Sequence, residues 1–207
     1  MKRVIQENPN TIIHWNEVYG KTGYPVGVDD LKFKYIAQHI INESSVCDLG
    51  CGNGDLLITI DEKNPNCELT GVDFSDLMIN SDKERLTKPN FNFICSDVTA
   101  TPLDDNQFDY VTCLETLEHV EKPQDLVREI YRILKPGGLA FLTTPYEDHI
   151  PSQEHIWQFN YKDVRDMFLE FSKVAVFPYA SGRQANFSDG RHYPSGNLDE
   201  IFVIAKK

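Results

Sequence analysis

The sequence predicts an α/β fold in which helices cover both faces of a doubly wound, mostly parallel sheet. From Ser45 onward, short apolar runs alternate with amphipathic helical segments, which is typical of repeated strand–helix–strand units. The first run breaks into a glycine-rich turn, Asp48 to Gly54, and acidic residues follow several later runs. Ligands bind at the carboxyl ends of the strands in such sheets, so we expect a small-molecule site at that edge.

Composition narrows the class of protein further. With 207 residues and 41% hydrophobic content, the chain can bury one core, and we expect one domain over residues 1–207. A net charge of −12 argues against nucleic-acid and anionic-membrane partners. No apolar run approaches membrane-spanning length, and the five cysteines include no CxxC pair. We therefore expect a cytoplasmic monomer or homodimer with reduced thiols.

The elements are expected in a regular order. Two helical segments, one carrying Trp15 and Tyr19 on a single face, occupy the first 40 residues. Ser75 is a suitable N-cap for a later helix, and Pro136 ends another. Strands are predicted at 46–49, 67–74, 90–95, 108–114, 139–143, 173–178 and 198–205, with further helices at 125–134 and 161–170.

The glycine-rich turn carries the clearest chemical signal. Gly50, Gly52 and Gly54 alternate with other residues, and glycine allows a ligand to lie directly against the main chain. The dinucleotide fingerprint has its third glycine three residues after the second, whereas the gap here is two. Asp48 precedes the turn and would repel a pyrophosphate but attract an ammonium group. The turn therefore indicates a nucleoside site for a positively charged ligand.

This turn resembles motif I of the class I S-adenosylmethionine-dependent methyltransferases, and the resemblance extends from 46 to 144, about half of the chain. It implies a Rossmann-like, seven-stranded sheet whose last strand is antiparallel and lies beside the fifth. It also implies S-adenosyl-L-methionine as cofactor, a helical cap at 1–40, a cofactor-binding half at 41–145 and an acceptor-side half at 146–207. The later motifs follow in the family's order at Gly71–Ser75, Cys95–Val98, Phe108–Val111 and Leu134–Gly138.

The motifs suggest a role for each acidic residue. Asp73 lies about twenty residues beyond the turn, the usual offset for a carboxylate that accepts from ribose hydroxyls. By resemblance, Asp97 would accept from the adenine amine and Asp48 would hold the methionine ammonium side. In the alternative interpretations, Asp73 only starts a helix, Asp97 only forms a solvated turn, and Asp48 only caps the glycine turn. The residues expected to bind cofactor are Trp15, Tyr19, Asp48, Gly50, Cys51, Gly52, Asp73, Phe74, Ser96, Asp97, Val98, Leu114 and Glu115.

Trp15 and Tyr19 have a second interpretation, in which they only anchor the first helix on the sheet. Phe74 and Val98 would lie on either side of adenine, or belong to the core. All four assignments depend on the resemblance rather than on residue spacing.

Potential metal ligands and bases gather after the fourth strand. Glu115, Glu118 and His119 would lie close together around a helical turn, and His155 is a fourth candidate. Small-RNA terminal 2′-O-methyltransferases show a similar E-x-x-E-H arrangement and bind a divalent metal. Ordinary small-molecule methyltransferases share E-H-V here without one, so we expect no metal. His119 and His155 are the candidate catalytic bases, although His119 has the alternative role of orienting the loop.

The acceptor is left open by the sequence, with a hydroxyl preferred over an amine. A sugar of a nucleotide-linked or glycan precursor, and a quinone-type or other metabolite, are the candidates. Arg183, Arg191 and His192 would hold a phosphate or carboxylate of the acceptor, unless Asp189 or Glu200 neutralises them locally. The alternatives are a metal-assisted RNA ribose 2′-O-methyltransferase and a cofactor-binding regulatory protein without catalysis.

Overall fold

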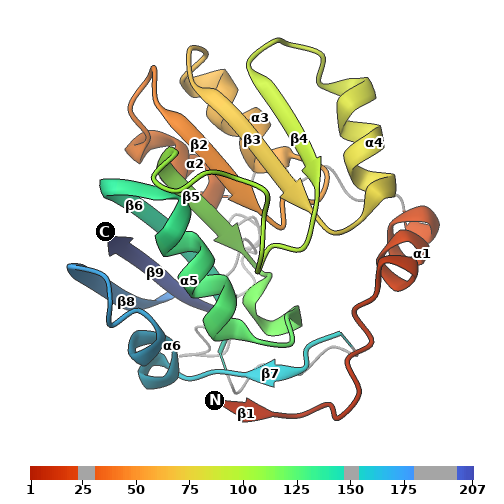
Figure 1. Cartoon of the computed structure of the whole chain (residues 1–207), viewed down its shortest axis with the longest axis vertical. Helices are drawn as coiled ribbons and strands as arrows, with labels where there is room; N and C mark the ends of the chain where they lie inside the picture. The colour runs from red at the N-terminus through yellow and green to blue at the C-terminus, as the bar shows by residue number, and fades with distance from the viewer. Residues whose placement is uncertain (23–30, 147–153, 180–199) are drawn as a thin grey trace, which may run out of the picture.

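The computed structural model describes residues 1–22, 31–146, 154–179 and 200–207. Its main sheet has seven strands in the order β4-β3-β2-β5-β6-β9-β8, and β9 is antiparallel to both of its neighbours. The expected fold class is confirmed, including the antiparallel last strand beside the fifth predicted strand (Figure 1). The strands are β2 (Ser45–Leu49), β3 (Glu68–Asp73), β4 (Phe91–Cys95), β5 (Phe108–Leu114), β6 (Leu134–Pro145), β8 (Lys173–Tyr179) and β9 (Glu200–Lys206).

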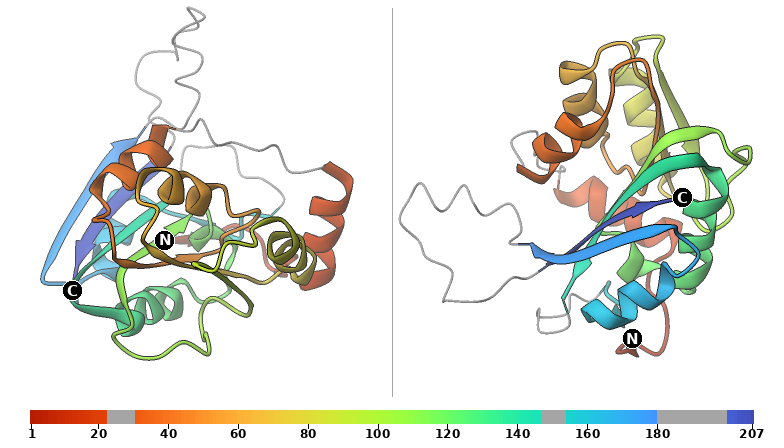
Figure 2. Two further views of the ribbon diagram at one scale, coloured as in Figure 1. Left: turned by 90° about the horizontal axis from the view of Figure 1, so that it is seen from above. Right: turned by 90° about the vertical axis from the view of Figure 1, so that its left-hand side faces the viewer.

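Helices cover both faces of this sheet, as Figure 2 shows from two directions. Successive strand residues point to opposite faces, so Val46 packs in one hydrophobic core and Cys47 in the other. Val46 shares its core with Ile36 and Ile60, whereas Cys47 shares its core with Ile130. The helices are α2 (Leu31–His39), α3 (Asp55–Lys63) and α4 (Asp76–Arg85) on the first face, and α5 (Pro123–Ile133) and α6 (Tyr161–Met167) on the second.

Two helices start at the carboxyl edge of the sheet, next to the glycine turn. Ser75 caps α4 as predicted, because its Oγ accepts a hydrogen bond from Met78 N at 3.2 Å. A Cβ at Gly71 would lie 2.8 Å from Cys51 Sγ, so only glycine in β3 lets the turn pack this closely. The turn, β3 and α4 therefore form one packed unit.

The first residues differ from the prediction. Instead of a helix, Lys2–Arg3 forms a strand, β1, that pairs antiparallel with Trp157–Gln158, β7. The Arg3 guanidinium stacks over the Trp157 ring at 5.4 Å and forms an ion pair with Glu121. A two-residue strand leaves no alternating pattern in the sequence, so this pairing was not predicted. The helix α1 (Ile12–Thr22) follows, as expected.

One strand boundary differs from the prediction, and one packing contact positions α1. β6 begins at Leu134 rather than at 139, because Leu134 already pairs with Phe108 before the proline–glycine segment. The helix α1 docks on the first turn of α4, where Asn16 accepts from Ser75 Oγ at 2.6 Å and donates to Asp76 at 2.7 Å. The amino-terminal segment is therefore held against the cofactor edge of the sheet.

All five cysteines are free thiols, and four are buried, as predicted, whereas Cys95 is exposed. No helix in the described segments combines the length and apolar character that a membrane span needs.

A buried charge network joins α5 to the segment between β4 and β5. The Glu129 carboxylate accepts hydrogen bonds from the Thr101 amide, at 2.9 Å, and from the Thr101 hydroxyl. Arg132 donates to both Glu129 oxygens, at 2.7 and 2.8 Å. Burial alone would raise the pKa of Glu129, but the hydrogen bonds from Arg132 and Thr101 outweigh it and the pKa is lowered.

We expect Glu129→Gln to lower the free energy of unfolding by about 1–3 kcal/mol, because it weakens charge-assisted bonds and leaves buried donors poorly paired. Since the folded-state pKa is lowered, this contribution is present above the unfolded pKa of about 4.3 and is lost as pH falls through the folded-state pKa. Denaturant unfolding at several pH values measures it. The exposed Glu84→Gln is the control, and an equal loss in that variant would contradict the network's role.

Candidate functional site

A cavity of about 690 Å³ opens at the carboxyl ends of β2, β3 and β5, within the usual range for small-molecule sites. All the predicted cofactor residues except Ser96 line it, and so do His119 and His155. Ser96 does not reach the cavity, because its exposed hydroxyl donates to the Asp97 carbonyl at 3.3 Å. The predicted clustering at the strand ends is therefore present in space.

Asp73 is anchored in the cavity wall through both of its carboxylate oxygens. Its side chain is buried, and its Oδ2 accepts from the Gly52 amide at 2.9 Å while its Oδ1 accepts from the Ser75 amide at 2.8 Å. Burial raises the pKa of Asp73, and these amides oppose that rise. Each oxygen keeps a second lone pair, so the carboxylate can accept further bonds from a ligand.

The glycine turn leaves room for a ligand at one position and none at another. Gly50, with φ +80°, faces Thr116, whose Oγ1 would lie 2.2 Å from an added Cβ. Gly52, with φ +53°, has no atom within 4 Å of an added Cβ and borders the cavity. A flat ligand can therefore approach the main chain at Gly52, which is what a nucleoside site requires.

Asp48 lies beneath the turn and is 4% exposed. Thr112 Oγ1 donates to its carboxylate at 2.6 Å. Burial raises the pKa of Asp48 to about 7, opposed by the Thr112 hydrogen bond and assisted by the negative charge of Asp73. A positively charged ligand group nearby would stabilise the ionised form, so this carboxyl is suited to a cationic partner.

Phe74 and Asp97 lie at the other end of the cavity. The Phe74 ring is 40% exposed although it is large and apolar, so it offers an uncovered face to the cavity. Asp97 Oδ1 accepts from the amide and the hydroxyl of Thr99, both at 2.8 Å, and so forms the turn that the alternative interpretation described. It also lines the cavity, and Val98 beside it is buried.

Trp15 and Tyr19 bring α1 to the cavity. Their rings stack with centroids 5.5 Å apart, and the Trp15 ring meets the edge of His119 at 5.1 Å. Both rings line the cavity while Asn16 anchors the helix on α4. Asn16 rather than the aromatic pair holds the helix on α4, and the cofactor role of Trp15 and Tyr19 stays a prediction.

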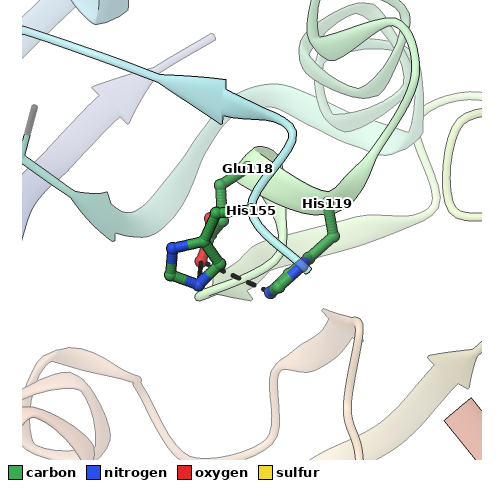
Figure 3. A group of neighbouring side chains, drawn as sticks. All are labelled: Glu118, His119 and His155. Carbon is green, nitrogen blue, oxygen red and sulfur yellow. Dashed lines mark ion pairs between the residues drawn. The ribbon is translucent and has the colours of Figure 1, made fainter. Parts of the chain in front are cut away.

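On the opposite wall, Glu118, His119 and His155 point toward one another (Figure 3). Glu118 lies in the short 3₁₀ helix η1 (Leu117–His119) and is 1% exposed. Its Oε2 accepts from Thr144 Oγ1 at 2.9 Å, whereas its Oε1 has no hydrogen-bond partner. Oε1 lies 3.6 Å from His119 Nε2 and 3.9 Å from His155 Nε2.

The His119 ring is oriented by a backbone carbonyl. Its Nδ1 lies 3.0 Å from the Glu154 carbonyl, which can only accept, so Nδ1 carries the proton and Nε2 presents a lone pair. Burial is the main reason that the pKa of His119 is lowered to about 4. Burial also raises the pKa of the Glu118 carboxyl well above its usual range. The wall therefore holds a neutral imidazole next to a deeply buried carboxyl.

Glu115 does not join this group, contrary to the prediction. It adopts φ +50° after β5, and its carboxylate accepts from Thr143 Oγ1 at 2.7 Å. Lys32 Nζ lies 3.9 Å from the same carboxylate. Glu115 is therefore directed along β6, away from the two histidines.

The remaining predicted residues, Arg183, Arg191 and His192, lie outside the described residues.

Lys32 is the clearest functional candidate that the sequence did not reveal. It is 6% exposed, lines the cavity from α2, and forms an ion pair with Glu200 at 3.1 Å. The partners are far apart in sequence, and Lys32 lies in a helix with several polar residues, so no local pattern marks it. Other unpredicted lining residues are Asn8, Asn10, Phe33, Asn53, Asp55, Leu56, Thr99, Thr116, Val120, Glu121, Lys122 and Asp125.

Comparisons with known proteins identify the family of the chain. A family model described as a methyltransferase domain matches residues 47–142. The chain is 32% identical over 167 residues, 78% of its length, to a demethylmenaquinone methyltransferase of Listeria monocytogenes, of which it covers 69%. It is 29% identical over 177 residues, 80% of its length, to a ubiquinone biosynthesis O-methyltransferase of Coxiella burnetii, of which it covers 75%.

Solved structures share the fold at lower identity. A SAM-dependent methyltransferase from Aquifex aeolicus superposes with a TM-score of 0.68 and 17% identity, over 92% of this chain and 97% of that one. The protein is an enzyme that uses S-adenosyl-L-methionine to methylate a small molecule. Motifs, fold and relatives agree, and the chain belongs to the class I S-adenosylmethionine-dependent methyltransferases.

Proposed function

We propose that the enzyme methylates a hydroxyl group of a small, ring-bearing acceptor. The observation that carries this proposal is the position of Glu118, His119 and His155, which line the same cavity as the glycine turn. A hydroxyl acceptor must lose its proton during methyl transfer, whereas an amine needs only to be neutral. The similarity to a ubiquinone biosynthesis O-methyltransferase supports oxygen as the acceptor atom.

The turn side of the cavity is proposed to hold the cofactor. S-adenosylmethionine supplies a methyl group on a positively charged sulfur. The ribose hydroxyls would donate to the Asp73 carboxylate, which Gly52 and Ser75 already orient. Asp48 would face the ammonium group, and the exposed ring of Phe74 would lie on the adenine. These are the roles that the resemblance implies. The hydrogen bonds to Asp73 and the exposed ring of Phe74 give each of these two side chains a structural reason for its role.

The opposite wall is proposed to remove the proton. His119 Nε2 and His155 lie on one side of the cavity, and Trp15 packs against His119. A hydroxyl held at this wall would lie close both to the base and to the methyl group of the cofactor. Such positioning lowers the barrier to methyl transfer. His119 and His155 remain the proposed catalytic residues.

The lining of the cavity favours an uncharged aromatic acceptor over RNA. Trp15, Tyr19 and Phe33 supply ring faces. Acidic residues outnumber the two lysines, Lys32 and Lys122, along the described lining, which disfavours a polyanion, in agreement with the net charge of −12. A phenolic, quinone-type acceptor fits these walls better than a nucleotide-linked sugar.

Four expectations from the sequence remain predictions. A sugar acceptor held by Arg183, Arg191 and His192 stays a prediction, because these residues lie outside the described segments. The cytoplasmic location, the single-domain organisation and the choice between monomer and homodimer also stay predictions.

An acceptor panel tests the proposed function. We expect release of S-adenosylhomocysteine with a catechol, and little or none with a UDP-sugar, a primary amine or a short RNA. Trp15→Ala should lower kcat/KM for the catechol by about tenfold or more through lost ring contact, while the exposed Ile13→Ala on the same helix has little effect. Methylation of the amine or the RNA alone would contradict a small hydroxyl acceptor.

Gly52→Ala tests the cofactor position. An added Cβ meets no protein atom but enters the cavity, so we expect the Kd for S-adenosylhomocysteine to rise at least tenfold. The positive φ adds a stability cost of about 1–2 kcal/mol. Gly137→Ala is the matched control, because Gly137 has φ +82° and lies away from the cavity. Calorimetry should show that Gly137→Ala leaves the affinity for S-adenosylhomocysteine unchanged. Unchanged affinity in Gly52→Ala as well would reject the placement of the cofactor at Gly52.

The pKa of Asp48 predicts how cofactor affinity depends on pH. A positive group favours the ionised carboxylate, so binding below a pKa of about 7 must release a proton. The Kd for S-adenosylhomocysteine should therefore rise as pH falls below about 7, by up to about tenfold per unit, and level off above it. Asp48→Asn should flatten this dependence. An identical slope in wild type and variant would show that another group titrates.

A further inference from the structure

We propose that Glu118, His119 and His155 bind one divalent transition-metal ion. The proposal deepens the proposed function and rests on it in part, because the ion would lie where the acceptor hydroxyl loses its proton. The site itself is argued from four independent features of the described residues.

The first feature is distance. One donor atom from each of the three residues lies within 4.8 Å of the others. Glu118 Oε1 is 3.6 Å from His119 Nε2 and 3.9 Å from His155 Nε2. A tetrahedral ion with bonds of about 2.0–2.2 Å separates its ligands by roughly 3.4 Å. Small side-chain rotations would therefore complete the coordination.

The second feature is an unsatisfied oxygen. Glu118 is 1% exposed, and its Oε1 has no hydrogen-bond partner. A buried carboxylate oxygen without a donor is costly, and such groups require an explanation. Oε1 points between the two imidazoles (Figure 3), where a cation would satisfy it.

The third feature is the orientation of the ligands from behind. His119 Nδ1 donates to the Glu154 carbonyl at 3.0 Å, and Thr144 Oγ1 donates to Glu118 Oε2 at 2.9 Å. Metal-binding histidines and carboxylates are typically held by such outer hydrogen bonds. These bonds occupy His119 Nδ1 and Glu118 Oε2, so His119 Nε2 and Glu118 Oε1 are the atoms that would coordinate the ion.

The fourth feature is the identity of the donors. Two imidazole nitrogens and one carboxylate oxygen suit Zn²⁺, Mn²⁺ or Fe²⁺, whereas Mg²⁺ prefers oxygen ligands alone. Three protein ligands leave at least one coordination position for another oxygen. The three residues line the cavity, so that oxygen would come from water or from the acceptor.

Glu115 is not one of the three ligands. The proposed site therefore differs from the E-x-x-E-H ligand pattern suggested by the sequence, which includes Glu115. Its carboxylate is taken by Thr143 at 2.7 Å and lies 3.9 Å from Lys32. Lys32 also pairs with Glu200 at 3.1 Å, so its ammonium group is shared between two carboxylates. The structure therefore assigns three ligands rather than four.

A cation at this place gives the methyl transfer a defined course. With the ion bound, His119 and His155 act as ligands rather than as bases, because the coordinating nitrogen of each has no lone pair left to accept a proton. The acceptor hydroxyl oxygen would bind the ion, which lowers the pKa of the hydroxyl, and its proton would pass to solvent. A lone pair of that oxygen then forms the new bond to the methyl carbon. The carbon–sulfur bond breaks, and its electron pair stays on sulfur as the neutral thioether, so no oxidant or reductant is needed.

Calorimetry on the chelator-treated, full-length enzyme tests the site with ZnCl₂, MnCl₂ and MgCl₂ as probes. We expect one ion per chain, with Zn²⁺ and Mn²⁺ bound more tightly than Mg²⁺. Glu118→Gln and His155→Ala should each weaken Mn²⁺ binding at least tenfold. His39→Ala, at an exposed histidine of α2, should leave it unchanged, and Glu115→Gln should change it less than Glu118→Gln does, because Glu115 supplies no ligand atom. A Co²⁺ absorption spectrum that changes in Glu118→Gln would provide a second readout.

Two results would overturn the proposal. One is wild-type enzyme that binds S-adenosylhomocysteine but no stoichiometric Zn²⁺ or Mn²⁺, and the other is a loss in Glu115→Gln as large as in Glu118→Gln. The experiment distinguishes failure of the metal site from failure of the proposed hydroxyl methylation. Catechol methylation that survives chelation without bound ion removes the metal site and leaves the function. Stoichiometric Mn²⁺ binding without methylation of any hydroxyl acceptor supports the site and removes the function.

Discussion

The buried carboxylate of Asp73 fixes the geometry on which the cofactor side depends. It stands at the end of β3 and accepts from the Gly52 amide in one loop and from the Ser75 amide in the next. Because β2 and β3 are parallel neighbours, both loops leave the sheet at the same edge, and one side chain can bridge them. Removing that bridge would release the glycine turn and the start of α4 together.

The opposite wall is built differently, from three segments that are distant in sequence. Glu118 belongs to η1, and its carbonyl accepts from the Ile156 amide at 3.0 Å. The Glu154 carbonyl accepts from both His119 Nδ1 and Asn10 Nδ2. Contacts from the amino terminus and from residues 154–158 therefore set the orientation of the histidine pair. The proposed cofactor wall and the proposed acceptor wall are held by separate hydrogen-bond systems that meet in one cavity.

The two walls also differ in how far they could be predicted from the sequence. The glycine turn, Asp73 and the Ser75 cap follow from spacing within one strand–turn–helix unit, so their positions are predicted correctly, while the cofactor roles of the turn and of Asp73 stay predictions. The β1–β7 pairing and the Lys32–Glu200 pair depend on contacts across more than a hundred residues, and no local pattern reports them. Glu115 was grouped with Glu118 by helical spacing, but its positive φ directs it elsewhere.

A crystal structure with S-adenosylhomocysteine bound tests the central claim, that one cavity joins a cofactor wall to a proton-removing wall. The account predicts ribose hydroxyls within hydrogen-bond distance of the Asp73 carboxylate and a cofactor sulfur that faces the Glu118–His119–His155 wall across open space. A cofactor whose ribose does not contact Asp73, or whose sulfur faces away from that wall, would contradict it.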